Sequence, residues 1–255
     1  MLQRLRLWMG CFSNGASCLP TVPLCTMNET PQAFGQRIRS FVPRQGRITA
    51  GQEFALAHYW PDYGLEPSQH YDFTEVFGRE APLVVEIGFG NGDSLAQMAA
   101  SNPGNNYIGI EVHRPGVGHL LMKIKEANLA NLRIYNYDAM EILEKYLPDN
   151  SLSGIHLFFP DPWPKKRHHK RRIVRPEFIK LLTRKLKVGG YFHAATDWQP
   201  YAEHMLDVLS AAHGLQNSSV TGDYCARPDY RPLTKFEQRG IRLGHGVWDL
   251  IFTKR

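Results

Sequence analysis

Short apolar runs alternate with longer amphipathic segments along most of the chain after residue 81. The runs that predict buried strands are Leu83–Ile87, Tyr107–Val112, Leu132–Tyr137, Gly154–Phe159, Tyr191–Ala195 and, near the end, Val247–Thr253. Apolar residues at helical spacing predict helices over Ser94–Ala100, Val117–Leu129, a stretch containing Ile142, Leu143 and Leu147, Pro176–Lys187 and Tyr201–Ala212. We expect Gly189 and Gly190 to end the helix that begins at Pro176. This alternation is typical of an α/β domain with a mostly parallel sheet and helices on both faces.

The first 80 residues have a different character from the alternating region. Residues 1–26 begin like a signal peptide but lack its cleavage pattern, and we interpret them as a non-conserved or mis-assigned leader that orders poorly. Residues 27–80 combine a basic arm (Arg37–Arg47) with an aromatic-rich lead-in, for which we expect a short helix and loops packed on the domain over 81–255. The arm suits nucleic-acid binding, and a plain solvated tail is an equally good interpretation.

Composition and charge narrow the class of protein. The 255 residues carry a formal net charge of +6, which favours a polyanionic partner. No stretch approaches the roughly 18 apolar residues that a membrane span requires. The 4 cysteines show neither Cys-x-x-Cys spacing nor histidines at zinc intervals, so we expect no disulfide framework and no metal site. A reduced, cytoplasmic compartment fits this cysteine usage best.

The densest positive charge directly follows a stiff turn. The apolar run that ends at Phe159 is broken by three prolines that enclose Asp161 and Trp163. Six Lys or Arg and two His follow between Lys165 and Arg172. A charge run by itself more often marks a solvated loop. The rigid turn with its acid and aromatic ring favours instead a base pocket with a phosphate clamp at its rim.

Carboxylates mark the ends of five successive predicted strands. In chain order they are Glu86, Glu111, Asp138, Asp161 and Asp197. The carboxyl ends of parallel strands meet at one edge of a sheet, and ligands of such sheets bind there, where the strand order reverses. So many acids at one rim repel one another, which indicates a ligand that satisfies them.

The glycine turn after the first strand favours one class of cofactor. It carries Gly88, Gly90 and Gly92. Gly88 and Gly90 let a ligand approach the backbone closely, but Asp93 stands where a dinucleotide fingerprint requires a glycine. Glu86 would attract an ammonium group, and Glu111 is spaced to accept from ribose hydroxyls. Asp138 is placed to accept from an adenine amine. Ammonium, ribose and adenine without phosphate describe S-adenosyl-L-methionine (AdoMet).

Several motifs together resemble those of bacterial tRNA (guanine-N7-)-methyltransferases. They are Val85–Gly92, Ile110–His113, Phe158–Trp163, Ala195–Trp198, Arg231–Gly240 and Gly244–Leu250. The resemblance runs from about Arg37 to the end of the chain, and residues 1–26 match nothing. It implies a class I methyltransferase fold over 81–255, with a Rossmann-like, mostly parallel seven-stranded sheet. The implied activity is methylation of N7 of guanine 46 in the variable loop of tRNA.

The same resemblance implies a role for each matching position. Cofactor binding falls on Glu86, Glu111, Asp138 and Asp161, and Asp161 is also the implied catalytic residue. Substrate-binding positions are Lys165, Asp197, Thr234, Lys235, Phe236 and Glu237. The implied RNA-contacting positions are Arg167, His168, His169, Lys170, Arg171 and Arg172.

The expected chemistry asks little of the protein. Guanine N7 already carries a lone pair, so no general base is needed, and catalysis rests on alignment and electrostatics. We expect Asp161 to stabilise the charge that methylation places on guanine, and Trp163 to stack on a base. Asp197 or Glu237 would accept from the Watson–Crick edge of guanine. Glu237 paired with Lys235 or Arg239 is the structural alternative.

Two other functions remain open at this point. A non-catalytic RNA-binding module could use the same fold, but the acids at Glu86, Glu111 and Asp138 argue against it. A small-molecule methyltransferase would leave the basic run unexplained. As partners we expect tRNA, no membrane and no obligatory protein, with the chain a monomer or a weak homodimer.

Overall fold

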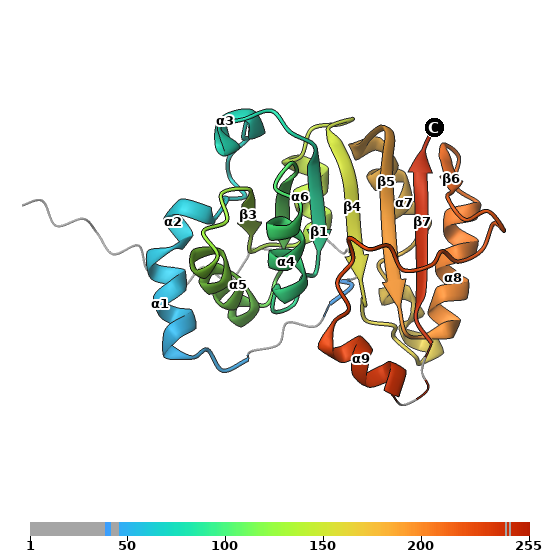
Figure 1. Ribbon diagram of the computed structural model, residues 1–255. Helices are drawn as coiled ribbons and strands as arrows, with labels where there is room; N and C mark the ends of the chain where they lie inside the picture. The colour runs from blue at the N-terminus through green and yellow to red at the C-terminus, as the bar shows by residue number, and fades with distance from the viewer. Residues whose placement is uncertain (1–38, 42–45, 243, 245) are drawn as a thin grey trace, which may run out of the picture. The chain divides into compact units, whose positions relative to one another are not determined.

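The fold is built on one mixed sheet. The structure, a computed structural model, describes residues 39–41, 46–242, 244 and 246–255. The sheet has 7 strands in the order β3-β2-β1-β4-β5-β7-β6 (Figure 1). The strands are β1 (Leu83–Ile87), β2 (Asn106–Ile110), β3 (Leu132–Tyr135), β4 (Leu152–Phe158), β5 (Leu186–Thr196), β6 (Leu215–Asn217) and β7 (Trp248–Lys254). The helices are α1 (Ala50–His58), α2 (Trp60–Tyr63), α3 (Phe73–Phe77), α4 (Asp93–Ser101), α5 (Arg114–Glu126), α6 (Ala139–Lys145), the 3₁₀ helix η1 (Lys166–Arg171), α7 (Pro176–Lys185), α8 (Gln199–Ser210) and α9 (Lys235–Arg242).

The strand pairing places the ligand edge of the sheet. β1 to β5 run parallel, and β7 lies antiparallel between β5 and β6. The chain moves outward from β1 to β2 and β3, and then crosses back to β4 on the other side of β1. Ligands of such sheets bind at this reversal of strand order, beyond the carboxyl ends of β1 and β4. The predicted α/β fold with a mostly parallel sheet is confirmed.

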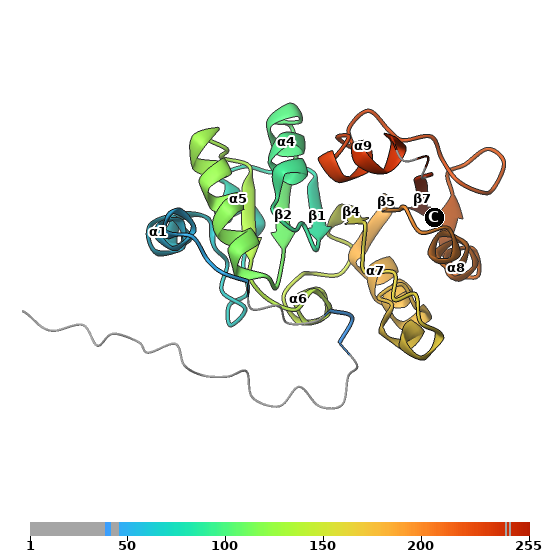
Figure 2. The same cartoon turned by 90° about the horizontal axis from the view of Figure 1, so that it is seen from below.

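Helices cover both faces of the sheet. Figure 2 shows α4 and α5 over one face and α6, α7 and α8 over the other. Alternate strand residues therefore enter two cores: Val84 belongs to the core that contains Leu120 of α5, whereas Val85 belongs to the core that contains Phe178 of α7. Burial on both faces explains why β1 reads as a continuous apolar run apart from Glu86.

The lead-in segment packs against one edge of this sheet. α1 lies against α5, where a Cβ on Gly118 would come within 2.9 Å of the Gln52 carbonyl oxygen. Gly64 forms an isolated parallel bridge to Ile134 in β3. The expected short helix and loops are thus three helices that extend the fold. In the part of the chain that the structure describes, no helix has the length and apolar character of a membrane span.

One predicted boundary is wrong. α7 ends at Lys185, and β5 begins at the next residue instead of after a glycine stop. Gly189 adopts φ 77°, and a Cβ on Gly190 would lie 2.8 Å from the Leu152 carbonyl oxygen. The two glycines therefore permit an irregularity within the β4–β5 pairing, where the register shifts between Leu152 and Gly154. Strand β6 and helix α9 were not predicted.

Candidate active site

The glycine turn leaves open space where a ligand can approach the backbone. Gly88 and Gly90 adopt φ values of 72° and 61°, and beyond its chain neighbours a Cβ on either would meet no heavy atom of the described residues within 4 Å. By contrast, a Cβ on Gly92 would lie 2.8 Å from Leu120, and one on Gly116 would lie 2.1 Å from the Gly90 carbonyl oxygen. Gly92 and Gly116 thus allow α5 to pack closely, whereas Gly88 and Gly90 line free space.

Glu86 is a buried acid that forms no ion pair with any described residue. Its side chain is 3% exposed, and its Oε2 has no hydrogen-bond partner among the described residues. Burial, and then the negative charge of Glu111, raise the pKa of Glu86 to about 8. A buried carboxyl oxygen without a partner is costly, so the arrangement suits a ligand that brings a positive, donating group.

Glu111 ties the turn to the neighbouring strand end. Its Oε2 accepts from the Gly90 N–H at 2.9 Å, and its Oε1 accepts from the N–H groups of Val112 and His113 at 2.7 and 2.9 Å. The Asn136 side-chain amide donates to the Glu111 carbonyl oxygen at 2.7 Å. The carboxylate is therefore fixed in orientation, and Oε2, which accepts one hydrogen bond here, keeps acceptor capacity for a ligand hydroxyl.

Asp138 has a local role that spacing alone did not indicate. It is the N-cap of α6, and its Oδ1 accepts from the Met140 N–H at 2.8 Å. The cap holds Asp138 next to the end of β3. Contact with an adenine amine stays a prediction.

Two strained residues frame Asp161. Phe159 and Trp163 adopt φ values of 50° and 47°, a left-handed conformation that bulky side chains rarely take. The Phe159 N–H donates to the Ala195 carbonyl oxygen at 2.8 Å, which joins this corner to β5. Asp161 itself is exposed to solvent. Strain of this kind concentrates at functional sites, and here it presents an acid outward from a stiff corner.

The basic run folds into η1 and the residues beside it. Lys165, Arg167 and Lys170 are exposed, and the two histidines are half-buried. The Arg171 guanidinium lies 4.2 Å from the centroid of the Trp163 ring and also donates to the Phe41 carbonyl oxygen at 3.2 Å.

The N-terminal segment also touches this corner, which the sequence did not lead us to expect. The Trp163 indole N–H donates to the Ser40 carbonyl oxygen at 3.1 Å. Ser40 and Phe41 therefore lie against the acid corner. The remaining residues of the predicted arm and leader, 1–38 and 42–45, lie outside the described residues.

Arg172 requires a correction. It is 3% exposed, and its Nε donates to the Pro162 carbonyl oxygen at 3.0 Å. Its guanidinium lies 4.7 Å from the centroid of the Tyr201 ring. A side chain held in this way does not present its charge to RNA; it braces the proline corner from within.

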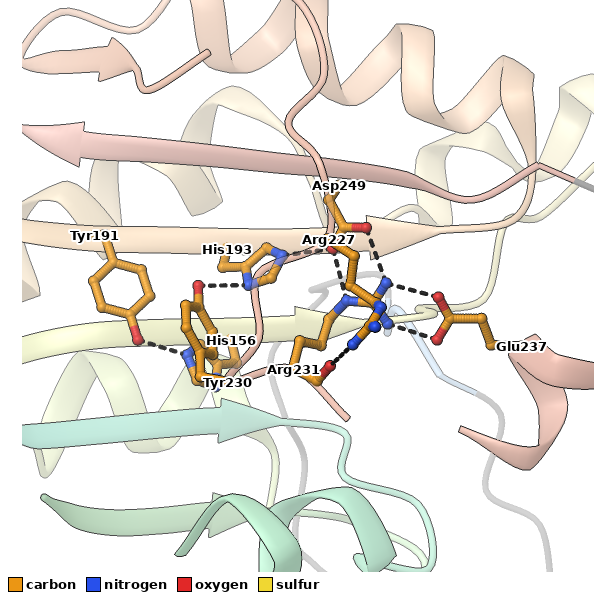
Figure 3. A network of polar contacts seen from close by, with 8 residues as sticks. All are labelled: His156, Tyr191, His193, Arg227, Tyr230, Arg231, Glu237 and Asp249. Atoms are coloured by element: carbon orange, nitrogen blue, oxygen red, sulfur yellow. Dashed lines mark hydrogen bonds and ion pairs between the residues drawn. The ribbon is translucent and has the colours of Figure 1, made fainter. Parts of the chain in front are cut away.

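The segment around α9 also differs from expectation. Glu237 lies in the first turn of α9, a helix that the sequence did not predict, and its N–H donates to Thr234 Oγ1 at 3.0 Å. Glu237 is buried and forms a two-pronged ion pair with Arg231 (Figure 3). The side chains of Lys235 and Phe236 lie outside the described part of the chain. Asp197, half-buried after β5, remains at the rim.

A buried polar network extends from Arg231 into the sheet. Figure 3 shows Asp249 of β7 between Arg231 and His193, with Tyr230 on the far side of the imidazole. The distances are 2.7 Å from Arg231 Nε to Asp249 Oδ1, 2.7 Å from His193 Nε2 to the same oxygen, and 2.8 Å between His193 Nδ1 and the Tyr230 hydroxyl. This network was not predicted from the sequence. The sequence offered one signal for it: His156, His193 and Asp249 interrupt strands that are otherwise largely apolar.

The geometry can be tested against AdoMet. The buried Glu86 oxygen suits an ammonium group, the fixed Glu111 carboxylate suits paired hydroxyls, and the space over Gly88 and Gly90 admits a ligand against the backbone. These residues therefore fit the cofactor. Together with the strand order, they define the chain as a class I methyltransferase.

Comparisons with known proteins place it more narrowly. The chain belongs to the tRNA (guanine-N(7)-)-methyltransferase family: it is 62% identical over 220 residues to the Shewanella amazonensis member, with 86% of this chain and 92% of the relative covered. The Yersinia enterocolitica member is also 62% identical, over 221 residues with the same coverage. A family model described as "Putative methyltransferase" matches residues 80–250. The family and the fold imply use of AdoMet.

Solved structures agree on the fold alone. A 16S rRNA methyltransferase, KamB, superposes with a TM-score of 0.54 at 17% identity, covering 73% of this chain and 94% of that one. The aminoglycoside resistance methyltransferase NpmB1 gives a TM-score of 0.50 at 16% identity, with 73% and 95% covered.

Proposed function

We propose that this protein transfers a methyl group from AdoMet to N7 of a guanine in the variable loop of tRNA. The observation that carries the proposal is the pairing of two features on the neighbouring strands β1 and β4. One is the buried Glu86, whose Oε2 has no partner within the described chain, beside an open glycine turn; the other is the stiff corner that presents Asp161. The similarity to tRNA (guanine-N(7)-)-methyltransferases over 86% of the chain supports the choice of substrate.

The cofactor-side residues act by binding and orientation. Glu86 would hold the ammonium group, Glu111 the ribose hydroxyls and Asp138 the adenine amine. When bound, AdoMet supplies an electrophilic methyl group on a positively charged sulfur. Because Glu111 is itself fixed by three backbone N–H groups, the position of the ribose would be set before RNA arrives.

The substrate-side residues align guanine and stabilise charge. N7 attacks with its own lone pair, so no residue has to remove a proton. The guanine ring gains positive charge as the new bond forms, and Asp161 is the exposed acid in the corner that can stabilise it. We favour Asp197 over Glu237 for the N1–H and N2–H₂ edge, because Glu237 is buried and both its oxygens accept from Arg231.

The RNA-side charges would clamp the backbone. We propose that the exposed Lys165, Arg167 and Lys170 contact phosphates, with the half-buried histidines contributing to the same face. Thr234, Lys235 and Phe236 remain proposed substrate-binding positions. tRNA is then the partner, and the cytoplasm, where tRNA resides, the proposed compartment.

The test is direct. Unmodified tRNA would be incubated with the protein and AdoMet, digested to nucleosides and analysed by mass spectrometry. We expect 7-methylguanosine, which should vanish when AdoMet is omitted or when the variable-loop guanine is replaced by adenine. Methylation of a different nucleoside, or of none, would overturn the proposal.

A further inference from the structure

Arg231 lies at the centre of a buried array that the reaction itself does not use. It is 1% exposed and stands among the largest fully buried side chains of the described residues. Its guanidinium donates to both oxygens of Asp249 at 2.7 and 2.9 Å, and to both oxygens of Glu237 at 2.7 Å each. A planar fork can serve two carboxylates in this way, whereas a lysine ammonium cannot.

The two carboxylates belong to different parts of the fold. Asp249 sits in β7, and Glu237 sits in the first turn of α9, next to the Thr234 cap. Figure 3 shows the guanidinium between them. Arg231 therefore attaches α9, through its first turn, to the central sheet.

The same guanidinium also borders the acid corner. Its carbon lies 5.9 Å from the centroid of the Phe158 ring and 5.7 Å from that of Phe159. Phe159 is the strained residue two positions before Asp161. One cation thus borders both the corner that presents the acid and the helix that begins at the proposed substrate-binding turn.

The surroundings hold Arg231 in this place and fix its charge. Burial alone would lower the pKa of Arg231, but the hydrogen bonds to Glu237 and Asp249 outweigh it and raise the pKa. Asp249, bound by Arg231, can only accept, so His193 donates through Nε2 and its Nδ1 accepts from the Tyr230 hydroxyl. The Arg227 side chain donates to the Arg231 carbonyl oxygen at 2.5 Å.

We propose that Arg231 is a positioning residue for methyl transfer: it sets the placement of the Thr234–Glu237 turn relative to the Asp161 corner without touching either substrate. This inference rests on the proposed function. It differs from a general structural role, because Glu86 and Glu111, at the ends of β1 and β2, make no hydrogen bond or ion pair with Arg231 among the described residues. Loss of Arg231 should therefore impair use of tRNA and leave cofactor binding intact.

The test compares Arg231→Lys with Arg133→Lys. Arg133 is a half-buried arginine on β3, at the opposite side of the sheet from β7, where it donates to backbone carbonyls and lies over two aromatic rings. In Arg231→Lys we expect amide hydrogen exchange in α9 to accelerate at least about tenfold, with β1 and β2 unchanged. The value of kcat/KM for tRNA at saturating AdoMet should fall about tenfold or more, since the variant cannot make all of these charged hydrogen bonds. AdoMet affinity should stay within about twofold, and Arg133→Lys should change none of these quantities.

Asp249→Asn provides a second route if Arg231→Lys does not fold. It keeps the arginine but neutralises the acid that anchors it to β7, so exchange in α9 should again rise and tRNA use should fall. A folded variant with unchanged exchange in α9 and unchanged kcat/KM would overturn the inference, as would an equal loss of AdoMet affinity. If the parent protein does not methylate tRNA but α9 still loosens as described, the proposed function fails while the anchoring by Arg231 stands.

Discussion

Replacing Glu86 by Gln should stabilise the protein, and the gain should depend on pH. The carboxyl has an ordinary pKa of 4.5 in the unfolded chain and a pKa of about 8 in the folded one. Between these pH values the folded state keeps a proton that the unfolded state has lost, so stability falls as pH rises from 4.5 to 8. A difference of this size corresponds to on the order of 5 kcal/mol above pH 8, as an upper estimate.

Glu86→Gln removes this titration and keeps the shape of the protonated acid. At about pH 8.5, without cofactor, we expect its melting temperature to exceed that of the parent by about 10 °C, since 1 kcal/mol shifts a domain of this size by roughly 2–4 °C. At about pH 4 the parent carboxyl is mostly neutral in both states, so the two proteins should melt nearly together, and this pH is the internal control. Calorimetry at both pH values measures the difference.

Cofactor should reduce the difference in melting temperature between the variant and the parent. An ammonium group beside the ionised Glu86 offsets the cost of burying the charge, so saturating AdoMet at about pH 8 should raise the melting temperature of the parent more than that of the variant.

The result that would refute the titration of Glu86 comes from the experiment without cofactor. If the melting temperatures of the parent and Glu86→Gln differ by the same amount at the acidic and the alkaline pH, the difference reports packing and not ionisation.

Three further outcomes follow from the site. Glu111→Ala should weaken AdoMet binding at least about 100-fold by calorimetry, because two hydroxyls lose a charged acceptor; unchanged affinity would contradict the ribose assignment. Arg167→Gln combined with Lys170→Gln should reduce the salt slope of tRNA binding by about 0.7–0.9 for each phosphate that is no longer neutralised, with AdoMet affinity unchanged. Lys187→Gln, an exposed lysine near the start of β5, is the matched control and should leave the slope as it is. Asp161→Asn should lower kcat about 100-fold and raise KM for tRNA much less, since the charge it stabilises appears mainly in the transition state; the reverse pattern in steady-state kinetics would mean that Asp161 binds ground-state guanine.

The parallel part of the sheet could be predicted because its strands are buried on both faces. Such strands read as unbroken apolar runs, and their ends then locate the rim without further information. The acids Glu86 and Glu111 stand out for the same reason: each interrupts or follows an apolar run. Both acids could be placed beside the glycine turn because the carboxyl ends of parallel strands meet at one edge of the sheet.

The elements that could not be predicted from the sequence depend on tertiary contacts. Helix α9 is mostly polar and contains a glycine, so its sequence is a weak helix signal, and its first turn is held by the ion pair between Glu237 and Arg231. Arg172 sits at the end of a run of like charges, where spacing does not tell which side chain turns inward. The α7–β5 junction was misplaced because its glycines serve a strand irregularity and not a helix cap.

The place of β7 in the sheet has a consequence for biosynthesis. It is the last of the described strands along the chain, yet it lies inside the sheet between β5 and β6, and it carries Asp249. On the ribosome, β1 to β3 with their cofactor acids can pair before β7 has been synthesised. Arg231 and α9 are not joined to the sheet through Asp249 until β7 has emerged. Maturation of the RNA side is thereby delayed relative to the cofactor side, because a chain that has not yet reached β7 lacks the anchored α9.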